Sequence, residues 1–226
     1  MEVFEIEKVL ASLSQRKPIF HSEKDMQASF ADEVKRLYPN AKVEREVAYN
    51  SVKGYVDENS EQPIHASTTW IDVLVSLDGA TYLVELKYKR KALTVVIGDQ
   101  QYDLKQDGAW NDNRYRYLHD VQKLEDYVAN EFNGHKIAEA YAVFITNDAE
   151  YQKEKRADSV IKDFDLSAGK VKTGVLRNTN KPEEQTVFLA GSYTVNWSEY
   201  SRVPADNSNI FWACTIRTNE AIIRKS

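Results

Sequence analysis

Residues 70–87 are the part of this 226-residue sequence that most constrains its fold. Two runs rich in β-branched and other apolar residues flank Asp78-Gly79, a dipeptide that strongly favours a two-residue turn between antiparallel strands. With such a turn, counting outward along both strands places Asp72 directly opposite Glu85. Side chains in facing positions have Cβ atoms about 4.5–5.5 Å apart, where two like charges are destabilising.

Alternation along the two strands predicts which side chains share a face of the hairpin. The first face receives a set of apolar side chains: Ile71, Val73, Val75, Tyr82, Val84 and Leu86. The second face combines charged and apolar side chains: Asp72, Leu74, Leu83, Glu85 and Lys87. Two carboxylates at the edge of an apolar surface need a cation, a shared proton or water.

A divalent metal ion that prefers oxygen ligands meets this need. Mg²⁺ binds one or two carboxylates and keeps its other positions for water and substrate phosphate, and Mn²⁺ accepts similar ligands. Lys87, two residues from Glu85, can lie beside the metal and orient or deprotonate a water, or stabilise negative charge at phosphorus. The alternative is a surface hairpin in which Lys87 forms a plain salt bridge with Asp72 or Glu85.

Helical and strand patterns mix along the rest of the chain, which favours an α/β or α+β fold around a central mixed β-sheet. A helix is expected to begin after Ser22, the predicted N-cap, and to end before Pro39. Helices are also expected over residues 2–14, 115–132 and 148–165, and a polar loop over 50–69. Strands are expected over residues 42–49, 140–146, 171–177, 186–190, 193–197 and 211–217.

The order Ile71-Asp72, a hairpin-length gap and then Glu85-Leu86-Lys87 resembles the signature of the PD-(D/E)XK nuclease superfamily, which has the restriction-endonuclease-like fold. An upstream helix beginning at His21-Ser22-Glu23 is similar to the Glu-bearing first core helix of bacterial members. The resemblance covers about residues 20–150, and Ile71 stands where the motif's name has proline.

This resemblance implies one nuclease-like domain over residues 1–226, with the C-terminal strands completing or extending the sheet. It implies Mg²⁺-dependent phosphodiester hydrolysis, with the metal held by Asp72 and Glu85. Lys87 would be the catalytic lysine and Glu23 an auxiliary carboxylate. Glu23 has an equally good simple interpretation, as a first-turn acid that favours the helix dipole.

Charge gives a second indication of the partner. The formal net charge of −5 argues against indiscriminate coating of nucleic acid, yet the stretch Lys87-Tyr88-Lys89-Arg90-Lys91 can supply a local basic surface. Lys89, Arg90 and Lys91 are therefore predicted nucleic-acid contacts, although most such runs are simply solvated. Arg114 is predicted as a further contact, because Arg114-Tyr115-Arg116-Tyr117 can pair with and stack on a nucleic-acid backbone; the alternative is that this stretch faces the core. Asp112 and Asp120 flank the region of Arg114 and are candidates to support the site, although solvated helix acids are the simpler interpretation.

Several classes of protein are excluded or disfavoured. No apolar run approaches the roughly 20 residues of a membrane-spanning helix, and no signal peptide is expected at the acidic amino terminus. The one cysteine, Cys214, excludes an internal disulfide and fits a reducing cytoplasm.

The sequence thus predicts a cytoplasmic, Mg²⁺- or Mn²⁺-dependent nuclease, with DNA as the expected substrate and a homodimer as the natural form for double-strand cutting. The alternative is a catalytically silent nuclease-like fold that serves as an interaction module for protein or nucleic acid, for which the 13 tyrosines are suited. A phosphatase ranks last, because no second metal cluster is visible.

Overall fold

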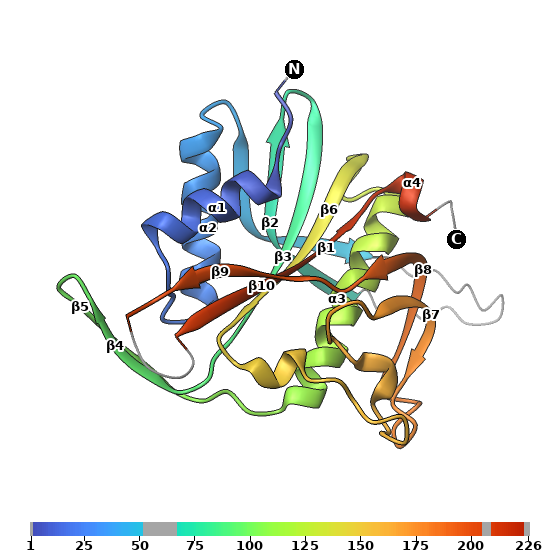
Figure 1. Cartoon of the computed structure of the whole chain (residues 1–226). Helices are drawn as coiled ribbons and strands as arrows, with labels where there is room; N and C mark the ends of the chain where they lie inside the picture. Colours follow the sequence, from blue (N-terminus) through green and yellow to red (C-terminus); the bar gives the residue numbers. More distant parts are fainter. Residues whose placement is uncertain (1, 52–66, 205–208, 224–226) are drawn as a thin grey trace.

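A mixed β-sheet lies at the centre of the structure, a computed structural model that describes residues 2–51, 67–204 and 209–223 (Figure 1). Within these residues six strands form the sheet in the order β1-β2-β3-β6-β10-β9. Their bounds are β1 Lys42–Ser51, β2 Ser67–Leu77, β3 Ala80–Lys89, β6 Ile137–Thr146, β9 Trp197–Arg202 and β10 Ile210–Thr218. Strands β3 and β6 are parallel and the other neighbours are antiparallel, which confirms the predicted mixed sheet.

The β2–β3 hairpin has the predicted turn and register. Asp78 and Gly79 have φ values of +48° and +83°, the left-handed conformation that a tight hairpin turn requires. Leu77 pairs with Ala80, and the ladder continues to Val73 opposite Val84. It ends there, one position before Asp72 and Glu85 would meet.

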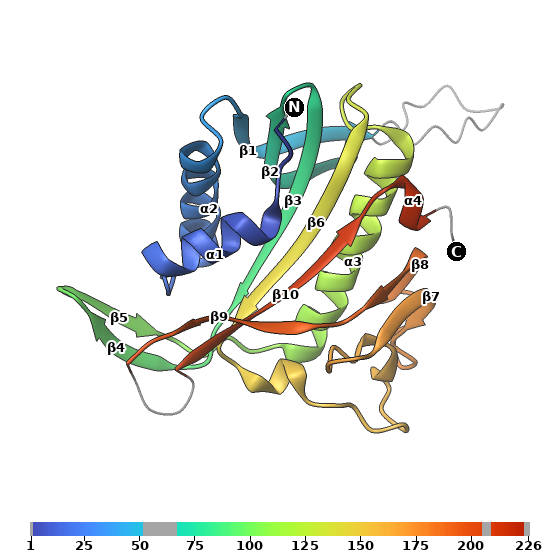
Figure 2. The same ribbon diagram turned by 45° about the horizontal axis from the view of Figure 1, so that its top comes forward.

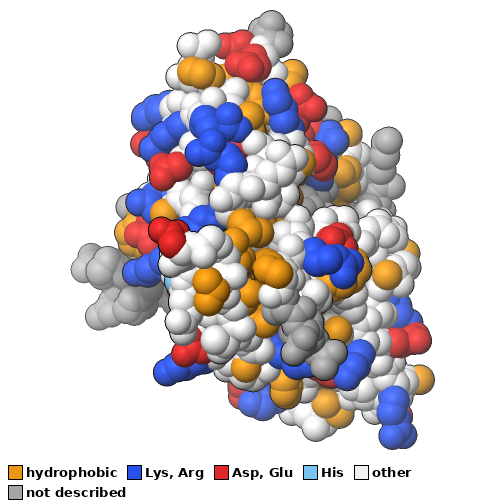
Figure 3. Space-filling model, turned by 60° about the vertical axis from the view of Figure 1, so that its left-hand side comes forward, with side chains coloured by type: hydrophobic (Ala, Val, Ile, Leu, Met, Phe, Trp, Pro, Cys, Tyr) orange, Lys and Arg blue, Asp and Glu red, His pale blue; other side chains and the backbone are white. Residues whose placement is uncertain are grey.

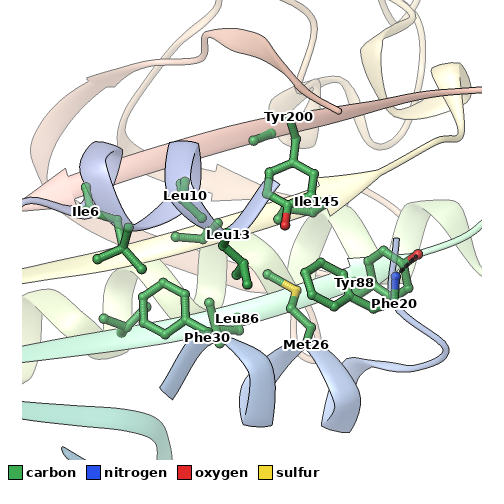
Figure 4. Close-up of a cluster of buried hydrophobic side chains, with 14 of the residues drawn as sticks. Ile6, Leu10, Leu13, Phe20, Met26, Phe30, Leu86, Tyr88, Ile145 and Tyr200 are labelled. Atoms are coloured by element: carbon green, nitrogen blue, oxygen red, sulfur yellow. Dashed lines mark hydrogen bonds between the residues drawn. The ribbon is translucent and has the colours of Figure 1, made fainter. Parts of the chain in front are cut away.

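Two helices cover one face of the sheet (Figure 1). They are α1, Ile6–Arg16, and α2, Glu23–Leu37. Their apolar stripes pack against side chains from β3 and β6, such as Leu86 and Ile145 (Figure 4). Met26 and Phe30 of α2 are fully buried in this cluster. The cluster fixes α2 against β3, and so places the first turn of α2 beside the end of that strand.

The start of α2 follows the predicted cap. The Ser22 hydroxyl accepts a hydrogen bond from the backbone N–H of Asp25 at 3.2 Å. We expect Ser22→Ala to lower the free energy of unfolding by about 1 kcal/mol, because it removes this acceptor. Urea unfolding measures the effect, with Ser22→Thr as the control that keeps a hydroxyl. An unchanged midpoint in Ser22→Ala would contradict the capping role.

The other face carries α3, Trp110–Asn130, and a separate two-stranded sheet of β7, Val171–Arg177, and β8, Thr186–Thr194 (Figure 2). A second buried cluster joins α3 to β6 and β10, with Leu118, Phe144 and Cys214 near its centre. Because β6 is covered on both faces, its near-continuous apolar sequence is explained.

Ile71 departs from the predicted alternation. It lies in the α3-side cluster, whereas Val73 lies in the α1–α2-side cluster. The β2–β3 ladder ends at this point, and Glu46 of β1, opposite Asp72, has a φ of +49°. The resulting twist turns Ile71 toward α3, which corrects its predicted place beside Val73.

Residues 148–165 were expected to form a charged helix, and that prediction is wrong. The segment contains two short 3₁₀ turns, Ala149–Gln152 and Lys162–Phe164. The carboxylates of Asp148 and Asp165 each accept a hydrogen bond from the backbone N–H two residues farther along the chain. Such bonds compete with helical ones.

Other elements differ from prediction in their bounds. The strand expected at 186–190 is part of β8, and the one expected at 193–197 spans the end of β8 and only the first residue of β9. Three short elements were not predicted: β4 Leu93–Ile97, β5 Gln100–Leu104 and α4 Glu220–Ile223. The expected loop at 50–69 is strand at both ends, and its residues 52–66 lie outside the described residues. Within the described residues, no helix is long and apolar enough to cross a membrane.

Candidate active site

The site lies where β3 loses its partner β2. On its other side β3 stays paired with β6 as far as Lys89. On the open side, three alternate backbone N–H groups donate to carboxylates instead of to a strand. The N–H of Leu86 donates to Asp72 Oδ2 at 2.7 Å, that of Tyr88 to Glu23 Oε2 at 3.0 Å, and that of Arg90 to Asp107 Oδ2 at 2.8 Å. These bonds satisfy the strand's backbone and gather three acids along one edge.

Cations balance these acids unequally. Asp107 forms a two-pronged pair with the Arg90 guanidinium, with both N–O distances at 2.9 Å. Glu23 pairs with Lys89 at 3.4 Å. Within the described residues, the hydrogen-bond donors to Asp72 are neutral: the N–H of Leu86 and the side-chain amide of Gln27, at 2.8 Å from Oδ1. Asp72 is thus the member of the row without a direct ion pair there.

Helix α3 supplies the other half of the site. Lys123 Nζ lies 2.6 Å from Glu85 Oε1 and also donates to the backbone oxygen of Trp70 at 3.0 Å. Lys87 Nζ lies 2.9 Å from Asp120 Oδ2. Asp120 and Lys123 lie one helical turn apart, and Lys123 Nζ is 3.9 Å from Asp120 Oδ1. They therefore present one acid and one base to the strand.

Burial and the charges of neighbouring carboxylates raise the pKa of both motif carboxyls. Burial raises the pKa of Asp72 to about 6, and the charges of Glu23 and Asp120 add to it against the Leu86 hydrogen bond. Burial also raises the pKa of Glu85 well above its usual range, and the Asp72 charge is the next cause. Lys123 opposes that rise without cancelling it.

The two lysines stay protonated. Burial on its own lowers the pKa of Lys87, but the Asp120 carboxylate outweighs it, so the net shift is upward. The same balance holds for Lys123, where Glu85 and Asp120 raise the pKa against burial. Both lysines are therefore fixed positive charges at neutral pH.

The donor set suits a divalent, oxygen-preferring ion. Asp72, Glu85, Asp120 and Glu23 outnumber the nearby ammonium groups of Lys87, Lys123 and Lys89 by one charge. Among the described residues, no three His, Cys, Asp or Glu side chains form a ready metal cluster. Mg²⁺ does not need one, since one or two carboxylates with water and phosphate complete its shell. The pKa values of Asp72 and Glu85 are raised first by burial and then by neighbouring carboxylates, and a bound cation would favour the ionised form of both.

The predicted basic contacts differ in their availability. The side chain of Lys91 is exposed, and Lys89 is partly exposed beside Glu23. Arg90 is engaged, since its guanidinium bonds to Asp107 and to the backbone oxygen of His21 at 2.8 Å. On the side of the molecule that carries α1, α2 and the β4–β5 hairpin, acidic and basic side chains are interspersed (Figure 3).

Arg114 is not a surface contact, which corrects the sequence prediction. Its side chain is 0% exposed, packs over the Tyr151 ring and donates to the backbone oxygen of Glu150. It ties α3 to the turn after β6. The buried residues Tyr117 and Leu118 follow Arg114 by three and four positions in α3, so Arg114 lies on the buried side of that helix.

Sequence reasoning missed three members of the site. Asp120 was assigned to solvent but contacts Lys87, whereas Asp112 does pair with its helix neighbour Arg116. Gln27 and Lys123 were not singled out. The available signal for α3 was spacing, because Asp120 and Lys123 lie one turn apart beside the apolar stripe. For Gln27, burial in the first two turns of α2 was not visible in the sequence.

The chain matches no protein-family model, no curated protein and no solved structure. The PD-(D/E)XK resemblance therefore rests on the motif residues and stays a prediction.

Proposed function

We propose that this protein is a metal-dependent nuclease that hydrolyses phosphodiester bonds, with DNA as its substrate and Mg²⁺ or Mn²⁺ as its cofactor. One observation carries the proposal: the Asp72 carboxylate bonds to the N–H of Leu86, next to Glu85 on the open edge of β3, and burial raises the pKa of both acids, that of Glu85 further through the Asp72 charge. Buried acids with displaced pKa values beside fixed cations are typical of catalytic sites.

The metal would be held by Asp72 and Glu85. When bound, a divalent ion polarises a phosphate oxygen and lowers the pKa of a coordinated water. The chain's own groups prepare the position. Gln27 and the Leu86 N–H orient the Asp72 carboxylate, and Lys123 balances the charge of Glu85.

Lys87 is assigned a charge-stabilising role. Of the roles open to it from the sequence, proton removal is disfavoured, because Asp120 keeps its ammonium group protonated. A protonated Lys87 can hold the attacking water and stabilise the negative charge that develops at phosphorus. Water adds to phosphorus and gives up one proton to solvent, the ester bond to the leaving oxygen breaks, and that oxygen gains a proton from solvent.

Other residues support the substrate and the frame. The carboxylate of Glu23, at the N-terminus of α2, fixes the end of β3 and adds to the negative field at Asp72. Lys89 and Lys91 are the proposed backbone-phosphate contacts. A homodimer and a reducing, cytoplasmic setting belong to the same proposal, the latter because the one cysteine, Cys214, is buried and unpaired.

Metal removal tests this function. We expect purified protein to cut supercoiled plasmid or single-stranded DNA in Mg²⁺ or Mn²⁺, to lose that cleavage in EDTA, and to regain it when excess metal is restored. Gel electrophoresis of the DNA measures each step. Cleavage that continues unchanged in EDTA would contradict the proposed role of the metal.

One contact favours the second candidate, a catalytically silent interaction module. The Lys123 ammonium, 2.6 Å from Glu85, already supplies a cation to the acid pair, as in a site that no longer binds metal. Titration calorimetry with Mn²⁺ separates the two. Metal binding that disappears in Asp72→Asn supports the nuclease, and the absence of any metal binding supports the module.

A further inference from the structure

Trp70 is a large aromatic side chain left exposed beside the carboxylate pair. Its exposed fraction is 55%, and it lies on β2 two residues before Asp72. Its backbone oxygen accepts a hydrogen bond from Lys123, the same ammonium group that pairs with Glu85. A single exposed aromatic ring is ordinary on a protein surface. Trp70 differs from other exposed rings because its backbone is bonded to Lys123, which pairs with Glu85, and because it lies two residues before Asp72.

Strand geometry places Trp70 and Asp72 on the same side of β2. The residue between them, Ile71, is buried in the α3-side cluster. The Thr69 hydroxyl bonds to Tyr127 of α3, so Thr69 and Ile71 both face α3 and Trp70 between them faces the opposite side. Asp72 agrees with this placement, because its carboxylate meets Gln27 of α2 on that side. Residues two apart on a strand are separated by about 6.6 Å. The Trp70 ring is thus within the reach of a nucleotide whose phosphate lies at Asp72.

The chemistry of this pairing points to a nucleobase. An exposed indole offers a flat face for stacking, and stacking on aromatic side chains binds bases with little regard to sequence. The faces of bases inside a duplex are already covered by their neighbours, so an indole can stack only on a base that is unpaired. Lys123 and Lys87, on the α3 side of the carboxylates, supply positive charge for the phosphate backbone that leads to this base.

We propose that Trp70 stacks on an unpaired base next to the phosphate bound at Asp72 and Glu85, so that the site takes single-stranded DNA in preference to intact duplex. This inference rests on the proposed nuclease function in taking DNA as the ligand. It goes further in naming the strand state and the residue that selects it.

Binding and cleavage measured together test the inference. A fluorescent single-stranded oligonucleotide is titrated in Ca²⁺, with its integrity checked on a gel, and binding is followed by anisotropy. We expect Trp70→Ala to bind about 5- to 100-fold more weakly, and Trp70→Phe to keep most of the affinity. The matched control is Phe188→Ala, since Phe188 is 56% exposed on β8, away from the site.

An abasic oligonucleotide distinguishes stacking from a structural effect. Removing the base that meets Trp70 is expected to weaken binding to the unsubstituted protein and to add nothing in Trp70→Ala. Equal binding by Trp70→Ala and the unsubstituted protein, or equal affinity for single strands and blunt duplex, overturns the inference. Failure of the unsubstituted protein to cut any DNA in Mg²⁺ overturns the nuclease function instead, and the binding measurements still decide the role of Trp70.

Discussion

Cleavage in Mg²⁺ falls by about 10³-fold or more when Asp72 is replaced by asparagine. The amide has almost the same shape, so it can accept the Leu86 N–H, and Gln27 can turn its own amide to pair with it. What is lost is the negative charge that holds the metal. Metal contacts stabilise the transition state by several kcal/mol, which corresponds to a change of this size. Single-turnover cleavage of a labelled oligonucleotide measures it.

Asp112→Asn is the matched control for this experiment. Asp112 is an aspartate outside the site, which pairs with Arg116 and accepts from Gln185, two turns of α3 before Asp120. Its substitution should leave the rate within about twofold, because Asp112 contacts neither strand of the site. A rate that survives in Asp72→Asn, or falls equally in both variants, would remove Asp72 from the metal site.

The metal-free protein gains stability from Asp72→Asn, and gains more as the pH rises. A carboxyl whose pKa is higher in the folded than in the unfolded state binds more protons when folded. Its stabilising effect is present when it is protonated and is lost as the pH rises through the folded value, here about 6 for Asp72 against 3.8 in the ordinary state. The difference in unfolding free energy between Asp72→Asn and the unsubstituted protein should therefore increase by about 2 kcal/mol between pH 4.5 and pH 7.5.

Urea unfolding in EDTA at several pH values measures this difference. The comparison between the two proteins is the informative quantity, because acids such as Asp25 and Asp107 have lowered pKa values and shift the stability of both proteins in the opposite direction. Saturating Mg²⁺ at pH 7.5 should stabilise the unsubstituted protein and reduce the gap. If the difference in unfolding free energy between the two proteins does not change with pH, the pKa of Asp72 is not raised in the folded protein.

The proposed metal gives a reason for placing these acids in a buried, negatively charged site. In the proposed nuclease, the stability given up at Asp72 and Glu85 becomes affinity for a divalent ion, since a bound cation offsets the neighbouring negative charges. Enzymes commonly trade stability for function in this way. We therefore expect Asp72→Asn to raise the unfolding free energy of the metal-free protein and to abolish most of its cleavage activity.

Local patterns in the sequence predicted much of the framework. The Asp78-Gly79 turn and the strand alternation beside it gave the β2–β3 register, because both depend on residues close together in the chain. The Ser22 cap and the stripe through Met26 and Phe30 gave α2 for the same reason. Elements with weak periodicity were missed or misassigned, such as the β4–β5 hairpin and residues 148–165.

The sequence by itself determined the β2–β3 turn and the register from Leu77–Ala80 to Val73–Val84, because a tight turn and a period of two leave these strands one arrangement, and Asp72 and Glu85 lie just beyond the last pair. Only the tertiary structure decided what surrounds them. The break between β2 and β3, the approach of Gln27 from α2 and of Lys123 and Asp120 from α3, and the burial of Arg114 depend on how helices pack on the sheet. Those contacts join residues distant in the chain, and their geometry comes from the filling of the whole core rather than from any local pattern.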